Sequence, residues 1–197
     1  MRSLWRTLAF VPVLAVLSSL PVEAQLTKNE RAELEKLVPK TAYLRIDLPC
    51  IYGKQGLIAS WVEPAVSVSP AGVQPLAEEG WRGSAWTGTK RTLSWPFAPN
   101  DALAYQELDV EKDGSVVLHL EGLGPKQQKK NREAAIRIVQ ARTPAEFKAA
   151  LDLAFSPVPL QDAHPDWPEA VRQAIGEHRL IETMTTEQAA CVVGKPL

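Results

Sequence analysis

The stretch from Ala102 to Glu121 constrains the fold most, because its pattern is that of two strands joined by a tight turn. Apolar and polar residues alternate on both sides of Lys112-Asp113-Gly114. Period-two alternation is typical of a half-buried strand. Asp-Gly between two such runs is a strong hairpin signal, since glycine readily adopts the positive φ that the turn requires. We therefore expect an antiparallel sheet.

Other short runs of apolar and β-branched residues are separated by Gly and Pro, as in a sheet of short strands. The clearest, Thr41 to Pro49, alternates strictly and predicts a strand with one wet face. The runs are 41–49, 57–62, 65–69, 91–95 and 134–140. Together with the hairpin they predict a small antiparallel sheet or partial barrel over about 41–140.

Helical patterns flank these strands. Leu26 to Val38 predicts an amphipathic helix that begins with a Thr27/Glu30 capping box. A second capping box at Thr143 opens a run whose apolar stripe predicts a helix covering the sheet. In the tail, capping boxes beginning at Asp166 and Thr185 predict a C-terminal helix pair. The sequence therefore predicts an α+β fold.

The N-terminus has the features of a secretory signal peptide. Arg2 and Arg6 precede a mostly apolar stretch, and Val22-Glu23-Ala24 is a suitable cleavage site. We expect residues 1–24 to be a signal peptide, 25–156 an α+β domain, and 157–197 a C-terminal helix pair packed on it. The alternative to cleavage is an uncleaved N-terminal anchor. We predict a soluble exported protein, periplasmic or extracellular, with no transmembrane span after signal removal.

Charge excludes one class of partner. Without Arg2, Arg6 and Glu23, the 22 basic and 23 acidic residues become 20 and 22, a formal net charge of −2. General nucleic-acid binding needs a basic surface, so we expect no nucleic-acid partner.

Export makes the two cysteines, Cys50 and Cys191, a candidate disulfide. The bond would close a loop of about 140 residues and contribute about 4–5 kcal/mol on the chain-entropy model. It would tie the end of the 41–49 strand to the last helix. The alternative is two buried thiols that never meet.

Two tryptophans are candidates for ligand binding. Trp81 and Trp86 lie in a glycine-containing loop, 78–88, and an indole offers a large apolar face with one N–H donor. They could form a platform for a carbohydrate or peptide. The alternative is that the tryptophans fill the core of the sheet or anchor the loop.

No catalytic or metal motif is present in the sequence. Neither an H-E-x-x-H nor a G-x-S-x-G pattern occurs, and no glycine-rich nucleotide fingerprint is found. His119 lies on a predicted strand and is read as a surface residue. His164 lies near Asp162 and Asp166 in a proline-rich loop and is a weak candidate for metal binding. We expect no cofactor, no metal and no catalytic residue.

The tail carries a family likeness. Met184-Thr185-x-Glu187-Gln188-Ala189, followed by Gly194-Lys195-Pro196, resembles the second-helix segment of the SmpA/OmlA family, the BamE-like outer-membrane assembly lipoproteins. The resemblance covers about thirty residues and implies a helix pair that contacts envelope proteins. This chain has Thr183 where that pattern usually has Gly, and no lipid-bearing cysteine follows the predicted cleavage site. The rest of the chain resembles uncharacterised exported bacterial proteins.

Three functions are compatible with these patterns. The first is a non-catalytic protein that binds another protein or component of the bacterial envelope. The second is a ligand-binding module that uses Trp81 and Trp86. The third is a hydrolase whose site is assembled from scattered residues such as His164 and Asp162.

Overall fold

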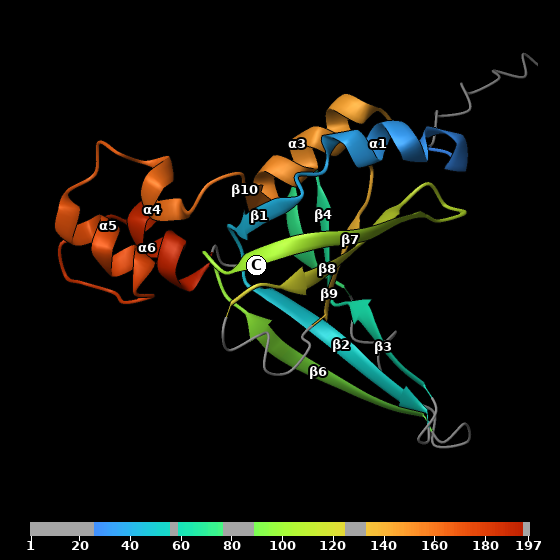
Figure 1. Cartoon of the computed structure of the whole chain (residues 1–197), viewed down its shortest axis with the longest axis horizontal. Helices are drawn as coiled ribbons and strands as arrows, with labels where there is room; N and C mark the ends of the chain where they lie inside the picture. The colour runs from blue at the N-terminus through green and yellow to red at the C-terminus, as the bar shows by residue number, and fades with distance from the viewer. Residues whose placement is uncertain (1–25, 56–58, 77–88, 125–132, 195–197) are drawn as a thin grey trace, which may run out of the picture.

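The computed structural model describes residues 26–55, 59–76, 89–124 and 133–194. Helices and mostly antiparallel sheets occur together, which confirms the α+β class. The strands form a seven-stranded sheet in the order β10-β1-β7-β8-β9-β4-β5 and a three-stranded sheet in the order β3-β2-β6. The β-structure is thus more extensive than the predicted small sheet, and its curled, mostly antiparallel strands agree with the alternative prediction of a partial barrel (Figure 1).

The strands of the larger sheet are β1 (Thr41–Leu44), β4 (Val66–Ser69), β5 (Gly72–Pro75), β7 (Ala102–Val110), β8 (Val116–Gly122), β9 (Glu133–Ile138) and β10 (Phe155–Ser156). Those of the smaller sheet are β2 (Leu48–Gln55), β3 (Ala59–Pro64) and β6 (Thr89–Phe97). The helices are the 3-10 turn η1 (Lys28–Glu30), α1 (Arg31–Leu37), α3 (Pro144–Ala154), α4 (Leu160–Ala163), α5 (Glu169–Gly176) and α6 (Thr186–Val193).

The predicted hairpin is present as β7 and β8. Val110 pairs with Val116, and Gly114 in the turn has φ +78°. The Asp113 carboxylate accepts hydrogen bonds from the Ser115 backbone N–H at 3.0 Å and from its hydroxyl at 2.6 Å. These bonds lower the pKa of Asp113, and a nearby Arg137 guanidinium acts in the same direction. The turn is therefore held by side chains as well as by glycine.

The single strand predicted for 41–49 is wrong, because the chain divides it between the two sheets. β1 ends at Leu44 and β2 begins at Leu48. Between them the Arg45 N–H donates to the carbonyl of Ala154 at 2.8 Å, and Arg45 Nε donates to the carbonyl of Phe155 at 2.9 Å. These long-range bonds turn the chain from one sheet into the other, which local alternation could not reveal.

The molecule is layered, with α1 and α3 on one side of the larger sheet and β2, β3 and β6 on the other (Figure 1). The main core lies between these layers and contains the fully buried Leu34, Leu118, Ile136 and Phe147. The stripe predicted for α3 is buried as expected, and the Thr143 hydroxyl accepts from the Glu146 N–H at 3.2 Å. Hydrophobic burial therefore ties α3 to the sheet.

The tail holds three helices where a pair was predicted, since α4 forms inside the predicted linker. The Thr185/Gln188 capping box of α6 is present. The capping box predicted at Asp166 is absent, because α5 starts after Pro168 and no side chain caps it. Within the described ranges, no helix is both long and apolar enough to cross a membrane.

Candidate functional site

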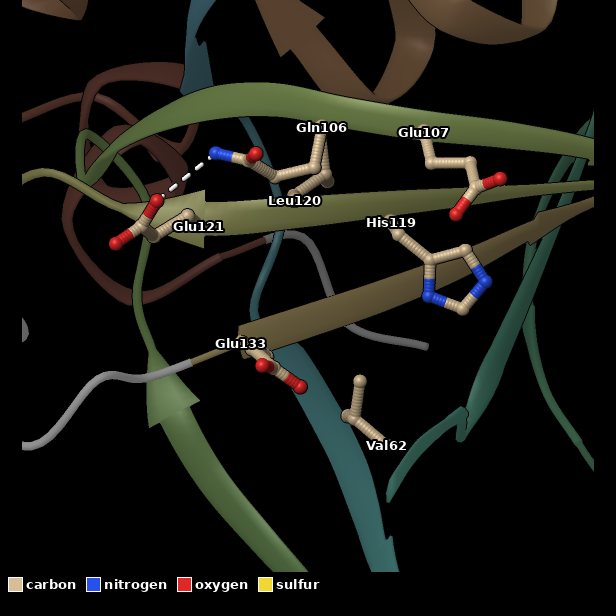
Figure 2. Close-up of a pocket in the computed structure, with 7 residues that line it drawn as sticks. All are labelled: Val62, Gln106, Glu107, His119, Leu120, Glu121 and Glu133. Carbon is tan, nitrogen blue, oxygen red and sulfur yellow. Dashed lines mark hydrogen bonds between the residues drawn. The ribbon is translucent and has the colours of Figure 1, made fainter. Parts of the chain in front are cut away.

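A concave site lined by described residues lies between the two sheets, where β3 approaches β7, β8 and β9 (Figure 2). Its cavity volume is about 440 Å³, which is within the size range of small-ligand pockets. The residues that line it are Val62, Gln106, Glu107, His119, Leu120, Glu121 and Glu133. Three of these seven carry a carboxylate, so the pocket is acidic.

Strand pairing brings the carboxylates together. Glu121 lies directly opposite Glu133 in the antiparallel pairing of β8 with β9. Glu107 lies opposite His119 in the pairing of β7 with β8. Directly opposed side chains on neighbouring strands lie about 5 Å apart at Cβ, and like charges there are destabilising. The sheet therefore places three carboxylates around one pocket, in two neighbouring cross-strand rows.

One end of the pocket is partly neutralised by α1. Arg31 Nη2 lies 3.4 Å from Glu107 Oε1, and Arg31 Nη1 lies 3.6 Å from Asp109 Oδ1. Arg31 also donates to Glu35 at 2.8 Å, a hydrogen bond that raises the pKa of the guanidinium. His119 Nε2 lies 3.8 Å from Asp109 Oδ2. This end already holds a cation of the protein's own.

At the other end of the pocket, the described contacts of Glu121 and Glu133 are with neutral groups. Gln106 Nε2 donates to Glu121 Oε2 at 2.8 Å, as Figure 2 shows, and Tyr52 Oη donates to the Glu133 carbonyl at 2.8 Å. Both contacts orient groups without adding positive charge. Within the part of the chain that the structure describes, no cation pairs with Glu121 or Glu133.

The predicted tryptophan site cannot be placed. Trp81 and Trp86 both lie outside the described residues. Their role as a ligand platform stays a prediction.

The cysteines are described, and no disulfide joins them. Cys50 lies in the main core on β2, where burial raises the pKa of its thiol to about 11. Cys191 packs instead against a second hydrophobic cluster, formed by the C-terminal helices. Membership of two separate clusters weighs against the predicted bond, and the disulfide stays a prediction.

The histidine loop of the tail has an aromatic contact of its own. The ring of His164 stacks on Trp167, with centroids 3.9 Å apart and planes 4° from parallel. His164 and Asp162 line neither this pocket nor the smaller one between α1 and α3. No group of three or more His, Cys, Asp or Glu suited to a metal ion occurs among the described residues.

Comparison of the chain with protein-family models, with curated proteins and with solved structures finds no significant match. The function must therefore be argued from the site itself.

The sequence patterns did not single out the glutamates, and they predicted only a surface position for His119. The register of the β7–β8 hairpin follows from its turn, so the pairing of Glu107 with His119 could have been derived from the Asp-Gly signal. The pairing of Glu121 with Glu133 could not be derived in this way, because the ten residues 123–132 separate the two strands, which is too long for a tight turn to set the register.

Proposed function

We propose that the protein is an exported, non-catalytic binding protein that holds a cationic group of a partner from the bacterial envelope in the pocket between β3 and β7–β9. The observation that carries the proposal is the pair Glu121 and Glu133, which lie directly opposite each other in a concave site and have no cationic partner among the described residues. Two carboxylates on neighbouring strands that line one pocket attract a cation.

The pocket suits the side chain of a lysine or arginine of a partner protein. Such a side chain combines an apolar stem with a charged end. Val62 and Leu120 supply apolar surface in the pocket, and the glutamates supply the counter-charge. Gln106 can hold Glu121 in position through its hydrogen bond. A partner with an exposed basic segment is therefore the class of ligand that fits.

Export is supported by the N-terminal segment. The basic residues Arg2 and Arg6, the apolar stretch after them and the small residues at 22 and 24 are the parts of a signal peptide. The likeness of the tail to envelope assembly lipoproteins points to the same compartment.

The proposal is tested with a defined cationic probe. Binding of an N-acetylated, C-amidated trilysine peptide to the purified protein is measured by calorimetry at low salt. Glu121→Gln and Glu133→Gln each remove one charge while keeping the shape of the side chain. We expect each to weaken binding by about two- to tenfold, because ion pairs at partly exposed sites contribute modestly.

The matched control is Glu182→Gln, which removes a charge from an exposed residue of the tail. It should leave peptide affinity unchanged. Equal affinity in all three variants, or no binding by the unaltered protein at low salt, would contradict the proposal.

A further inference from the structure

The C-terminal helices form a unit with its own small core. The hydrophobic cluster of α4, α5 and α6 contains Leu160, Val171, Ile175 and Val192 and is separate from the main core. In Figure 1 the three helices stand to one side of the sheets. Because the two cores are not continuous, attachment of this helical unit depends strongly on local contacts at its two ends. Elements with few shared apolar contacts are those that open most easily.

The first end is held by Asn100, in the connection between β6 and β7. Its Oδ1 accepts from the Leu160 N–H at 2.8 Å, and its Nδ2 donates to Gln161 Oε1 at 2.7 Å. The Asn100 N–H in turn donates to the carbonyl of Leu44 at 2.7 Å. This attachment involves neutral groups and does not change with pH.

The second end is held where α6 meets the segment between β1 and β2. Gly194 follows α6 with φ +80° and is buried. A Cβ built on Gly194 would lie 2.7 Å from Asp47 Oδ2 and 3.1 Å from the Asp47 backbone nitrogen. The end of the helix therefore lies directly against the Asp47 carboxyl group, with no room for a side chain.

This contact is unfavourable for a charged carboxylate. The last turn of a helix exposes carbonyl groups and carries partial negative charge. No basic residue lies in the last turn of α6 to offset it. Burial raises the pKa of Asp47, and the carboxyl has no ion pair among the described residues. The neutral acid is the better partner for the helix end.

Among the described residues, the other titratable groups near this contact do not compensate for the charge. Arg45, on the same segment, donates through Nε to the carbonyl of Phe155. The Asp101 carboxylate, in the connection before β7, accepts from the Ala98 N–H at 2.9 Å. On α6 itself, the last turn carries one titratable group, the Cys191 thiol. On β10, Phe155 and Ser156 are uncharged.

We propose that Asp47 is a pH-sensitive switch for attachment of the helical unit, which is held firmly when the carboxyl is protonated and loosened when it is ionised against the end of α6. Because the pKa of Asp47 is raised, attachment of the helical unit weakens as the pH rises. The contribution of protonated Asp47 is present in full below the ordinary pKa of 3.8 and is lost as pH rises through the pKa of the attached state.

Hydrogen exchange followed by mass spectrometry tests the switch in the whole chain. Asp47→Asn keeps the shape of the side chain and removes the charge. At pH 7 we expect amides of α5 and α6 to exchange about two- to fivefold more slowly in this variant than in the unaltered protein. Amides of β7 and β8 should exchange at equal rates in both. The variants are compared at the same pH, so intrinsic exchange rates cancel.

Toward pH 4 the difference should shrink, because the protonated fraction of Asp47 in the unaltered protein rises as the pH falls toward its raised pKa. Glu182→Gln is the control for removal of a charge. It should change neither the exchange rate of the α5 and α6 amides nor that of the β7 and β8 amides. Asp47→Glu retains the charge and should not slow exchange. Equal rates for Asp47→Asn and the unaltered protein at pH 7, or a difference that persists unchanged at pH 4, would overturn the proposal.

Discussion

Glu121 on β8 lies directly opposite Glu133 on β9, with Gln106 donating a hydrogen bond to Glu121 at 2.8 Å. Opposed like charges on neighbouring strands destabilise a sheet. A pair of this kind is a feature that stability alone does not favour. Natural proteins retain such costs at sites where binding uses the charge.

The first prediction concerns the stability cost of this pair. Glu133→Gln should raise the free energy of unfolding by about 0.2–1 kcal/mol, because it removes the repulsion while preserving the backbone bond to Tyr52. Chemical denaturation at low salt measures the change. Glu182→Gln should leave stability nearly unchanged. A Glu133→Gln variant less stable than the unaltered protein would mean that the carboxylate is favourably placed.

The second prediction concerns the hairpin turn. Asp113→Ala removes the acceptor for two Ser115 donors and the partner of Arg137, so it should destabilise the protein by about 1 kcal/mol. Bonds from Ser115 are the main cause of the lowered pKa of Asp113. The stabilisation is therefore present above the ordinary pKa of 3.8 and lost as pH falls through the lowered pKa.

Thermal unfolding of the unaltered protein and of Asp113→Ala checks this at two pH values. The difference in Tm between the two proteins should be present at about pH 6 and smaller at about pH 2, because the pKa of Asp113 is lowered from 3.8 and the carboxylate becomes increasingly protonated as the pH falls through it. Glu111 is exposed and precedes Asp113 by two positions, so Glu111→Ala is the control for loss of a nearby charge. A gap that is the same at both pH values would show that Asp113 acts through something other than its ionised carboxylate.

Local patterns predicted the elements whose causes are local. The Asp-Gly turn and its flanking alternation identified β7 and β8, and the Thr143 and Thr185 boxes located the starts of α3 and α6. These signals depend on neighbours within a few residues, which is why a single sequence shows them.

Long-range contacts decided what local patterns could not. The 41–49 run alternates throughout, but bonds from Arg45 to Ala154 and Phe155 divide it between two sheets. β4 pairs in parallel with β9, with Ser67 opposite Arg137. These segments are distant in the sequence, so no turn signal predicts the contact. The pocket depends on the same kind of contact, because Glu133 reaches Glu121 only when β9 joins β8.

The third prediction concerns the reactivity of the thiols. In reduced protein, Cys191 should be alkylated by iodoacetamide well before Cys50. Burial raises the pKa of Cys50 to about 11, so little thiolate is present at pH 8. Cys191 is only half-buried on α6. Peptide mapping after timed alkylation gives both rates, and faster labelling of Cys50 would contradict the placement of β2 in the core.

The same mapping under non-reducing conditions, on protein isolated from the exported fraction, tests the predicted disulfide. A linked Cys50–Cys191 peptide would show that the tail lies closer to β2 in the exported protein than in this structure. Two separately alkylated cysteines would leave the helical unit held only by its non-covalent contacts.

The last prediction compares two glycines of the helical unit. Gly194→Ala should destabilise the attached unit by at least about 1–3 kcal/mol, because alanine is strained at φ +80° and its Cβ would overlap Asp47. Gly176→Ala is the matched substitution on α5. Its Cβ would meet only the Gln161 side chain at 3.7 Å, an ordinary contact distance. Alanine there should be neutral or stabilise by up to about 1 kcal/mol.

Hydrogen exchange separates loss of attachment from global unfolding in this pair. Gly194→Ala should speed exchange in α5 and α6 while β7 and β8 keep their protection, because the main core does not include the helical unit. Gly176→Ala should leave both regions protected. If Gly194→Ala instead lowered protection of the sheets and the helices equally, the helical unit and the sheets would unfold as one cooperative body, and the contact between Asp47 and Gly194 could not act as an independent point of release.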